Sequence, residues 1–121
     1  MFPYENLEVY KKAFELNRKV YGLLKSKKTI PGYLKDQLGR ASLSIMLNIA
    51  EGSGRFSAKD RRNFFVTARS SAFECSSIVS FLLSENEITE VEKVELMQNF
   101  EEISKILFVM IKNLNTKAEQ K

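Results

Sequence analysis

The chain has 121 residues, of which 28% are charged and 44% hydrophobic, a balance typical of a folded domain that buries a core. It contains no histidine and a single cysteine, which excludes an internal disulfide and argues against a zinc site or histidine-based catalysis. No apolar run approaches the roughly 18 residues of a membrane span, and the first residues lack the pattern of a secretory signal. We therefore expect a single cytoplasmic domain, residues 1–121, that is not an enzyme and needs no cofactor or metal.

The formal net charge of +4 is unevenly distributed along the chain. Residues 1–70 hold fourteen Lys or Arg and six Asp or Glu, whereas residues 71–121 hold five and nine. The first segment therefore has a net charge of +8 and the second a net charge of −4. This asymmetry suggests an anionic partner for the first segment.

A first helix is predicted over residues 4–27, because Pro3 favours a helix start and apolar side chains follow at helical spacing. The predicted core-facing row is Leu7, Tyr10, Phe14, Tyr21 and Leu24, widened by Val9, Leu16, Val20 and Leu23. A second helix is predicted over residues 33–52, after a break at Pro31 and Gly32. Gly52 and Gly54 are predicted to end it, since glycine takes the left-handed conformation of a helix C-terminus without strain.

The third and fourth helices are predicted over residues 58–85 and 90–114, and the segments Ser57–Asp60 and Thr89–Glu92 resemble capping boxes at their starts. Cys75 falls on the apolar stripe of the third helix, which indicates a buried structural thiol. Four helices with short links and no convincing strand predict an all-α protein, an antiparallel up-down-up-down four-helix bundle. The second and fourth helices carry more apolar residues than a lone bundle buries, which predicts a homo-oligomer.

A polar stripe crosses the otherwise apolar second helix. Its members are Arg40, Ser44, Asn48 and Glu51, followed by Arg55. Glu51 and Arg55 are spaced as an i,i+4 ion pair, and Arg40 is within reach of Ser44 or of Glu74 on the third helix. Buried charges persist only when they are paired, so we interpret the stripe and Glu74 as a structural network. A ligand or nucleic-acid site is the alternative.

Four cations surround the turn between the second and third helices. They are Arg55, Lys59, Arg61 and Arg62, and we call them the basic turn. In this topology the turn shares an end with both termini, near Lys112, Lys117 and Lys121. At the other end Lys25, Lys27 and Lys28 lie beside Glu85, Glu87 and Glu90 and can be neutralised by them. Phe56 follows Arg55, either to stack on a nucleic-acid base or to act as a hydrophobic staple for the third helix.

From about Phe2 to Leu114 the sequence resembles the bacterial four-helix-bundle proteins encoded in intervening sequences of the 23S rRNA gene. The resemblance rests on Leu7-x-Val9-Tyr10, Pro31, Gln37-Leu38-x-Arg40-Ala41-Ser42-x-Ser44-Ile45, Asn48-Ile49-Ala50-Glu51-Gly52, Arg55, Ser57, Phe64, Ser71 and Glu74. Where that family often has a second basic residue before Arg40, this chain has Gly39.

The resemblance implies a homopentamer of antiparallel bundles and a relationship to accessory proteins of diversity-generating retroelements, which are basic pentamers that associate with nucleic acid and a reverse transcriptase. It supplies no catalytic residues. With the basic turn, it leads to the expectation of a non-catalytic, oligomeric protein that binds nucleic acid, with RNA preferred. The alternative is a structural adaptor whose oligomer binds a protein partner without contacting nucleic acid.

Overall fold

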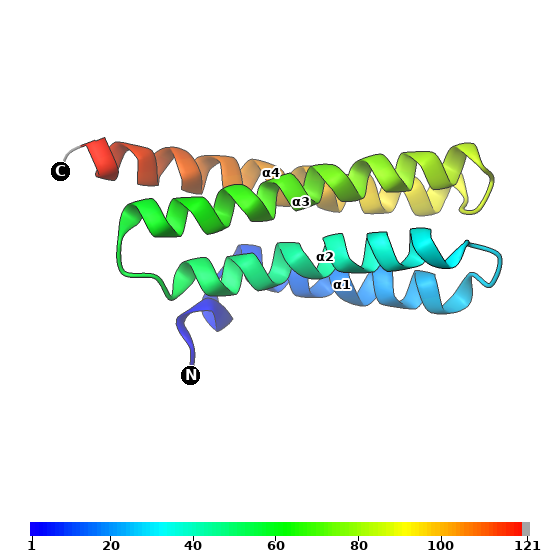
Figure 1. Ribbon diagram of the computed structural model, residues 1–121, viewed down its shortest axis with the longest axis horizontal. Helices are drawn as coiled ribbons and strands as arrows, with labels where there is room; N and C mark the ends of the chain where they lie inside the picture. The colour runs from blue at the N-terminus through cyan, green and yellow to red at the C-terminus, as the bar shows by residue number, and fades with distance from the viewer. Residues whose placement is uncertain (120–121) are drawn as a thin grey trace.

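The computed structural model describes residues 1–119 and consists of four long antiparallel helices (Figure 1). A short 3₁₀ helix, Pro3–Asn6, precedes α1, Glu8–Ser26; the others are α2, Gly32–Ser53, α3, Ala58–Ser84, and α4, Glu90–Glu119. Each helix packs on the next one in the chain, and α4 also contacts α1, so the predicted up-down-up-down bundle is confirmed. Within residues 1–119 there is no strand, and no helix is long and apolar enough to cross a membrane.

The core takes one aliphatic row from each helix. The largest fully buried side chains are Leu16, Val20, Leu38, Ile45, Ile49, Cys75, Val79, Leu82, Phe100, Ile103 and Leu107. Burial raises the pKa of the Cys75 thiol to about 12, so at neutral pH it stays protonated and packs as a small apolar group, as predicted.

The predicted core face of the first helix is partly right: Val9, Leu16 and Val20, which were expected to widen it, are buried, whereas the row expected at its centre is not fully buried. The row that faces the core is Val9, Ala13, Leu16 and Val20, whereas Phe14 is 46% and Tyr21 68% exposed. The two rows lie side by side on the helix, and only one can point at the bundle axis. The buried row contains Ala13, which allows closer helix packing than an aromatic residue does.

The ends of the first and last helices also differ from the prediction. Residues 3–6 form the 3₁₀ turn, and Leu7 has extended backbone, with φ −75° and ψ 126°, so α1 begins only at Glu8. The last helix continues past Leu114 to Glu119. There Leu114 is half-buried and Asn115 accepts a hydrogen bond of 3.4 Å from Arg62 of α3, so contacts with the start of α3 support the added turn.

The helix caps are partly those predicted. Thr89 and Glu92 form the complete capping box, with their backbone N–H groups donating to each other's side-chain oxygens at 2.8 and 3.1 Å. Ser57 Oγ accepts from the Asp60 N–H at 3.1 Å. The second helix ends at Ser53, beside the predicted Gly52 and Gly54, but in residues 1–119 no glycine has positive φ, so the left-handed conformation predicted for these glycines is wrong. The left-handed residue is Asn86, φ 60°, at the end of α3.

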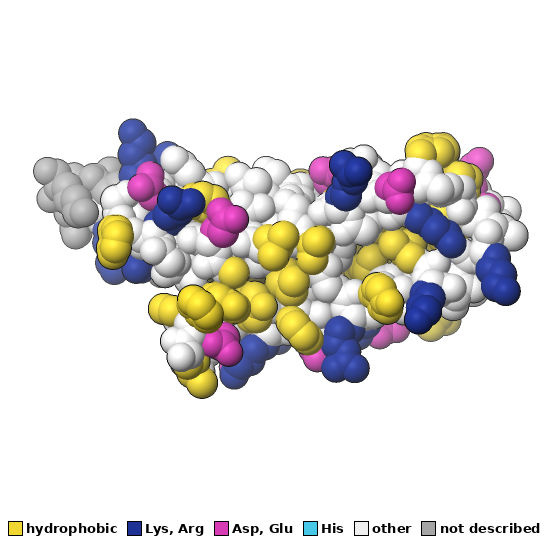
Figure 2. Space-filling view, turned by 60° about the horizontal axis from the view of Figure 1, so that its bottom comes forward, with side chains coloured by type: hydrophobic (Ala, Val, Ile, Leu, Met, Phe, Trp, Pro, Cys, Tyr) yellow, Lys and Arg dark blue, Asp and Glu magenta, His cyan; other side chains and the backbone are white. Residues whose placement is uncertain are grey.

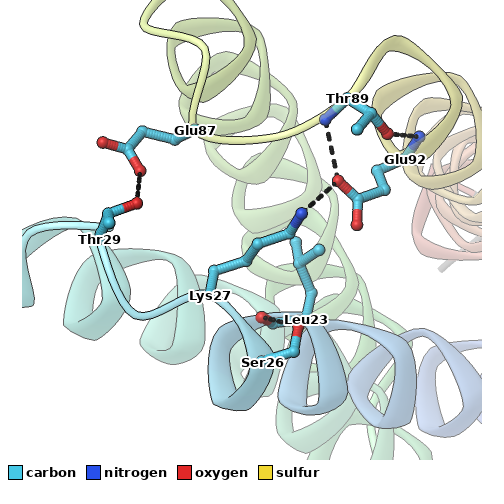
Figure 3. Close-up of polar contacts among 7 residues, drawn as sticks. All are labelled: Leu23, Ser26, Lys27, Thr29, Glu87, Thr89 and Glu92. Carbon is cyan, nitrogen blue, oxygen red and sulfur yellow. Dashed lines mark hydrogen bonds and ion pairs between the residues drawn. The ribbon is translucent and has the colours of Figure 1, made fainter.

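Polar contacts join the α1–α2 and α3–α4 loops at the end of the bundle away from the termini (Figure 3). Lys27 Nζ lies 2.9 Å from Glu92 Oε1, and Thr29 Oγ1 donates to Glu87 Oε2 at 2.7 Å. Charge neutralisation at this end was predicted, but the lysine's partner is Glu92 rather than Glu85, Glu87 or Glu90. Burial works to raise the pKa of Glu92, but the Thr89 N–H and the Lys27 ammonium outweigh it and the pKa is lowered.

The lowered pKa of Glu92 predicts a pH-dependent contribution to stability. The charged form stabilises the fold above the ordinary carboxyl pKa of 4.5, and this contribution is lost as the pH falls through the lower folded-state pKa. Glu92→Gln keeps an acceptor for the Thr89 N–H but removes the charge facing Lys27. At pH near 7 the variant should unfold with a free energy lower by about 0.2–1 kcal/mol. Urea titrations at neutral and acid pH should show this difference shrinking in acid; a constant difference would contradict the prediction.

Candidate nucleic-acid interface

The basic turn lies at the end of the bundle that also holds the 3₁₀ helix and the last turns of α4 (Figure 1). This shared end follows from the topology, because two antiparallel crossings return the chain to the side on which it began. Lys112 and Lys117 lie on the part of α4 near this end and are exposed. Lys121, which the sequence analysis placed here as well, lies outside the described residues. The N-terminus of α3 adds the partial positive charge of a helix dipole.

The cations of the basic turn are held in different ways. The Arg61 guanidinium donates through Nε to the Arg55 carbonyl at 2.6 Å, which ties the first turn of α3 to the loop. Arg62 donates to Asn115 and, at 3.0 Å, to Asn63, so its hydrogen bonds go to neutral side chains. Lys59 is exposed. In the part of the chain that the structure describes, none of Lys59, Arg61 and Arg62 forms an ion pair with a carboxylate.

Arg55 differs from the other three cations because it has two partners within the bundle. Its guanidinium carbon lies 4.5 Å from the centroid of the Phe64 ring, a cation–π contact. One of its nitrogens lies 3.8 Å from Glu51 Oε2, at the outer limit of an ion pair. The Arg55 side chain is still 49% exposed, so it retains donors for a further anion.

Phe56 is fully exposed, with a relative exposure of 103%. A hydrophobic staple needs an apolar partner four residues into the helix, but that position after the Ser57 cap is Arg61. The staple interpretation of Phe56 is therefore wrong, and its ring makes no contribution to the core.

The structural network predicted on the polar stripe is only partly present. Ser44 Oγ lies 2.8 Å from Ser71 Oγ of α3, and Asn48 Nδ2 donates to Ser44 Oγ at 3.0 Å. Arg40 and Glu51 are exposed, so the prediction of a buried ion pair is wrong. Glu51 is 59% exposed, and Glu51→Ala therefore lacks the large cost expected for a buried charge.

Glu74 accepts a hydrogen bond from Gln37, not from Arg40. The turn of α2 that points at Glu74 is one turn earlier than predicted. The spacing of residues in a helix shows which of them share a face. It does not show how far a neighbouring helix is shifted along the bundle axis, and this shift decides which residues of the two helices meet.

A polar pair between α1 and α2, the buried Ser42 and the half-buried Asn17, was not predicted from the sequence. Ser42 is fully buried, and its hydroxyl donates to Asn17 Oδ1 at 3.0 Å. Asn17 Nδ2 donates in turn to the carbonyls of Ser42 and Ala13, both at 2.9 Å. The sequence feature that could have indicated this pair is Asn17, a polar residue close to the core residues Leu16 and Val20 on the first helix.

Comparison with known proteins gives the family. The model of the 23S rRNA-intervening sequence protein family matches residues 5–109. The chain belongs to this family. The crystal structure of a Bacteroides thetaiotaomicron protein, described as a member of the S23 ribosomal protein family with unknown function, is similar to the chain with a TM-score of 0.82 and 25% sequence identity. The match covers 86% of this chain and 98% of that one, whereas no curated protein matches significantly.

In this chain the part of α2 that carries the family resemblance is mainly structural. Its buried residues are Leu38, Ala41, Ser42, Ile45, Ile49 and Gly52, all on the inner face of α2. Ser44 and Asn48 bond toward α3, and Arg40 and Glu51 are its exposed members. The segment therefore fixes the packing of α2 on its neighbours, and the free cations of the basic turn lie just beyond it.

Proposed function

We propose that this chain is a non-catalytic, homo-oligomeric RNA-binding protein of the cytoplasm, and that the basic turn is its main contact with RNA. The observation that carries the proposal is the set Lys59, Arg61 and Arg62, which has no carboxylate partner within the described residues and lies beside the half-exposed Arg55. Such cations neutralise phosphates and release their counterions. The family name, which refers to a segment of ribosomal RNA genes, is consistent with an RNA ligand.

The proposal predicts salt-sensitive binding that depends on the basic turn. We expect a generic RNA to bind more weakly as salt rises. Replacing Lys59, Arg61 and Arg62 by alanine should lower the affinity about ten-fold or more and flatten the logarithmic salt slope by about 2 for each copy engaged, as three phosphate contacts are lost. Fluorescence anisotropy of a labelled RNA over a salt series measures both quantities. Arg55 is left intact because its contacts with Phe64 and Glu51 also belong to the fold.

A second triple variant, Lys28→Ala, Lys35→Ala and Lys93→Ala, is the matched control. It removes the same charge from the opposite end of the bundle, so it should retain more affinity than the first variant and most of the salt slope. Equal losses in the two variants would show that overall charge, not the basic turn, governs binding. An unchanged affinity in the first variant would overturn the proposal.

The oligomeric part of the proposal rests on two apolar grooves. The α1–α2 groove has a volume of about 830 Å³ and includes Phe14, Tyr21, Leu24, Leu43 and Met46. Figure 2 shows hydrophobic side chains gathered along this face. The α3–α4 groove, of about 440 Å³, includes Val66, Arg69, Phe73, Phe108 and Ile111. Surplus apolar surface was predicted for the second and fourth helices. In the two grooves, α1 and α3 expose apolar side chains as well.

The two grooves belong to different helix pairs, α1–α2 and α3–α4. Figure 1 shows these pairs on opposite sides of the bundle. A contact between one groove and the other groove of the next copy is heterologous, and repeating it gives a closed ring when the rotation between copies divides a full turn. We therefore propose a cyclic homo-oligomer, with the pentamer that the family resemblance implies as its size.

Phe108→Glu should reduce the oligomer to smaller species, because Phe108 is 53% exposed in the α3–α4 groove and a charge there opposes burial. Val91→Glu is the control: it places the same charge on α4 outside this groove, at a residue that is 76% exposed. Light scattering measures both masses. A wild-type mass near the 13.9 kDa of one chain would contradict the oligomer.

The alternative function, an adaptor that binds a protein partner, is favoured by the same exposed grooves. It predicts an oligomer whose binding of RNA is absent or insensitive to the basic turn. The salt series and the first triple variant therefore distinguish the two functions.

A further inference from the structure

We infer that Phe56 stacks on an unpaired base, so that the basic turn selects single-stranded RNA over duplex RNA. This inference rests on the proposed function and adds to it a class of ligand, single-stranded RNA, and a residue that distinguishes it from duplex RNA. The observation behind it is a fully exposed aromatic ring placed among cations and used nowhere in the fold. Within the described residues, Phe56 takes part in none of the aromatic or cation–π contacts.

The backbone on both sides of Phe56 is fixed, although its side chain is free. The Arg55 N–H donates to the Gly52 carbonyl at 3.3 Å, and the Arg55 carbonyl accepts from Arg61. On the other side, Ser57 caps α3 through Asp60. A ring on an anchored backbone loses little conformational freedom when it meets a ligand, which favours its use in binding.

The neighbours of Phe56 indicate the kind of ligand. The exposed or half-buried residues around it in the turn are Gly54, Arg55, Ser57 and Lys59, which are small or cationic, whereas Ala58 is buried. Protein hot spots lie instead in well-packed apolar pockets. An aromatic ring between cations matches a nucleic acid strand, whose phosphates meet the charges while a base meets the ring.

Duplex RNA does not offer this contact. Its bases are stacked on one another and paired, and duplexes are read mostly through phosphates and 2′-hydroxyl groups. The cations therefore contribute to the binding of both forms, whereas the ring contributes only where a base is unstacked. Stacking on one aromatic side chain changes affinity by about 5-fold or more.

The test compares one RNA sequence of about 15 nucleotides, labelled and unstructured, with its duplex at the same salt concentration. The wild-type protein should bind the single strand more tightly. Phe56→Leu, which keeps an apolar side chain without a ring, should weaken single-strand binding about 5-fold or more while duplex affinity and both salt slopes stay unchanged. Phe56→Trp should restore the preference. Thermal melting and light scattering should find the variants folded and with wild-type mass.

Equal wild-type affinity for the two RNA forms, or a Phe56→Leu effect of the same size on both, would overturn this inference while the proposed RNA-binding function stands. Absence of binding to either form would overturn both. A change of mass in Phe56→Leu would show that Phe56 packs against another copy of the chain, which also overturns the inference.

Discussion

Gly52→Ala is expected to destabilise the protein by about 1–3 kcal/mol, although alanine is the better helix former by about 1 kcal/mol. Gly52 is buried near the end of α2, where α3 begins its return. A Cβ added there would lie 2.7 Å from Phe65 Cε1 and 3.0 Å from Phe64 Cβ. The Phe65 ring is itself buried, and the Phe64 atom belongs to the base of its side chain, so neither can move away cheaply.

Gly22→Ala is the control for this prediction. Gly22 lies in the interior of α1, and no atom is found within 4 Å of a Cβ added there. Its replacement should stabilise the protein by about 0.5–1 kcal/mol through helix propensity alone. Urea unfolding of the two variants should therefore move the midpoint in opposite directions. A gain of stability in both would show that α2 and α3 are not in close contact at Gly52.

The misinterpretation of Gly52 shows where local sequence signals stop. A glycine near a helix end followed by another glycine fits a left-handed C-terminus, and that pattern was read correctly as a boundary. The actual requirement is space for Phe65, thirteen residues later and on another helix. The need for a glycine at this position depends on where the turn places α3 against α2. The spacing of neighbouring residues does not specify that placement.

The first helix shows a related limit. Its two apolar rows are adjacent, so hydrophobic periodicity gives the helix and its period but not which row faces the axis. Phe14 and Tyr21, which were assigned to the core, line the α1–α2 groove instead, whereas Leu7 and Tyr10 of the same predicted row pack partly buried against the core. Which row of a helix is buried depends on the size of its side chains and on how they pack against the other three helices. The sequence of one helix does not contain that information.

The basic turn was predictable because its four cations lie within eight residues of one another and depend only on the topology. The ion pair between Glu51 and Arg55 was predicted with the right spacing and the wrong burial. Glu51 lies in the last turn of α2 and Arg55 lies in the turn that follows, and both side chains are exposed. Where polar contacts between helices reach the buried interior, they come from short side chains, Ser44 with Ser71 and Ser42 with Asn17, since small groups fit between close helices. Longer side chains, such as Gln37 with Glu74, meet across helices at the exposed surface.

Asn17→Ala should lower the free energy of unfolding by about 1–3 kcal/mol, because it leaves a buried hydroxyl without its partner. Ser42 is fully buried, and Asn17 accepts its hydrogen bond while donating to two main-chain carbonyls. Ser42→Ala should cost less, since alanine fills nearly the same volume and Asn17 keeps its two carbonyl acceptors.

A double-mutant cycle on Asn17 and Ser42 tests this account. In Asn17→Ala part of the cost is the unsatisfied Ser42 hydroxyl, and that part disappears when Ser42→Ala is added. The double variant should therefore lose less stability than the two single variants together, with a coupling of about 0.5–3 kcal/mol measured by urea unfolding. Additive losses would contradict the account and would mean that the hydroxyl finds the carbonyl four residues earlier in α2. Coupling of the predicted size would instead show that one asparagine of α1 fixes its register against α2, and with it the two walls of the α1–α2 groove.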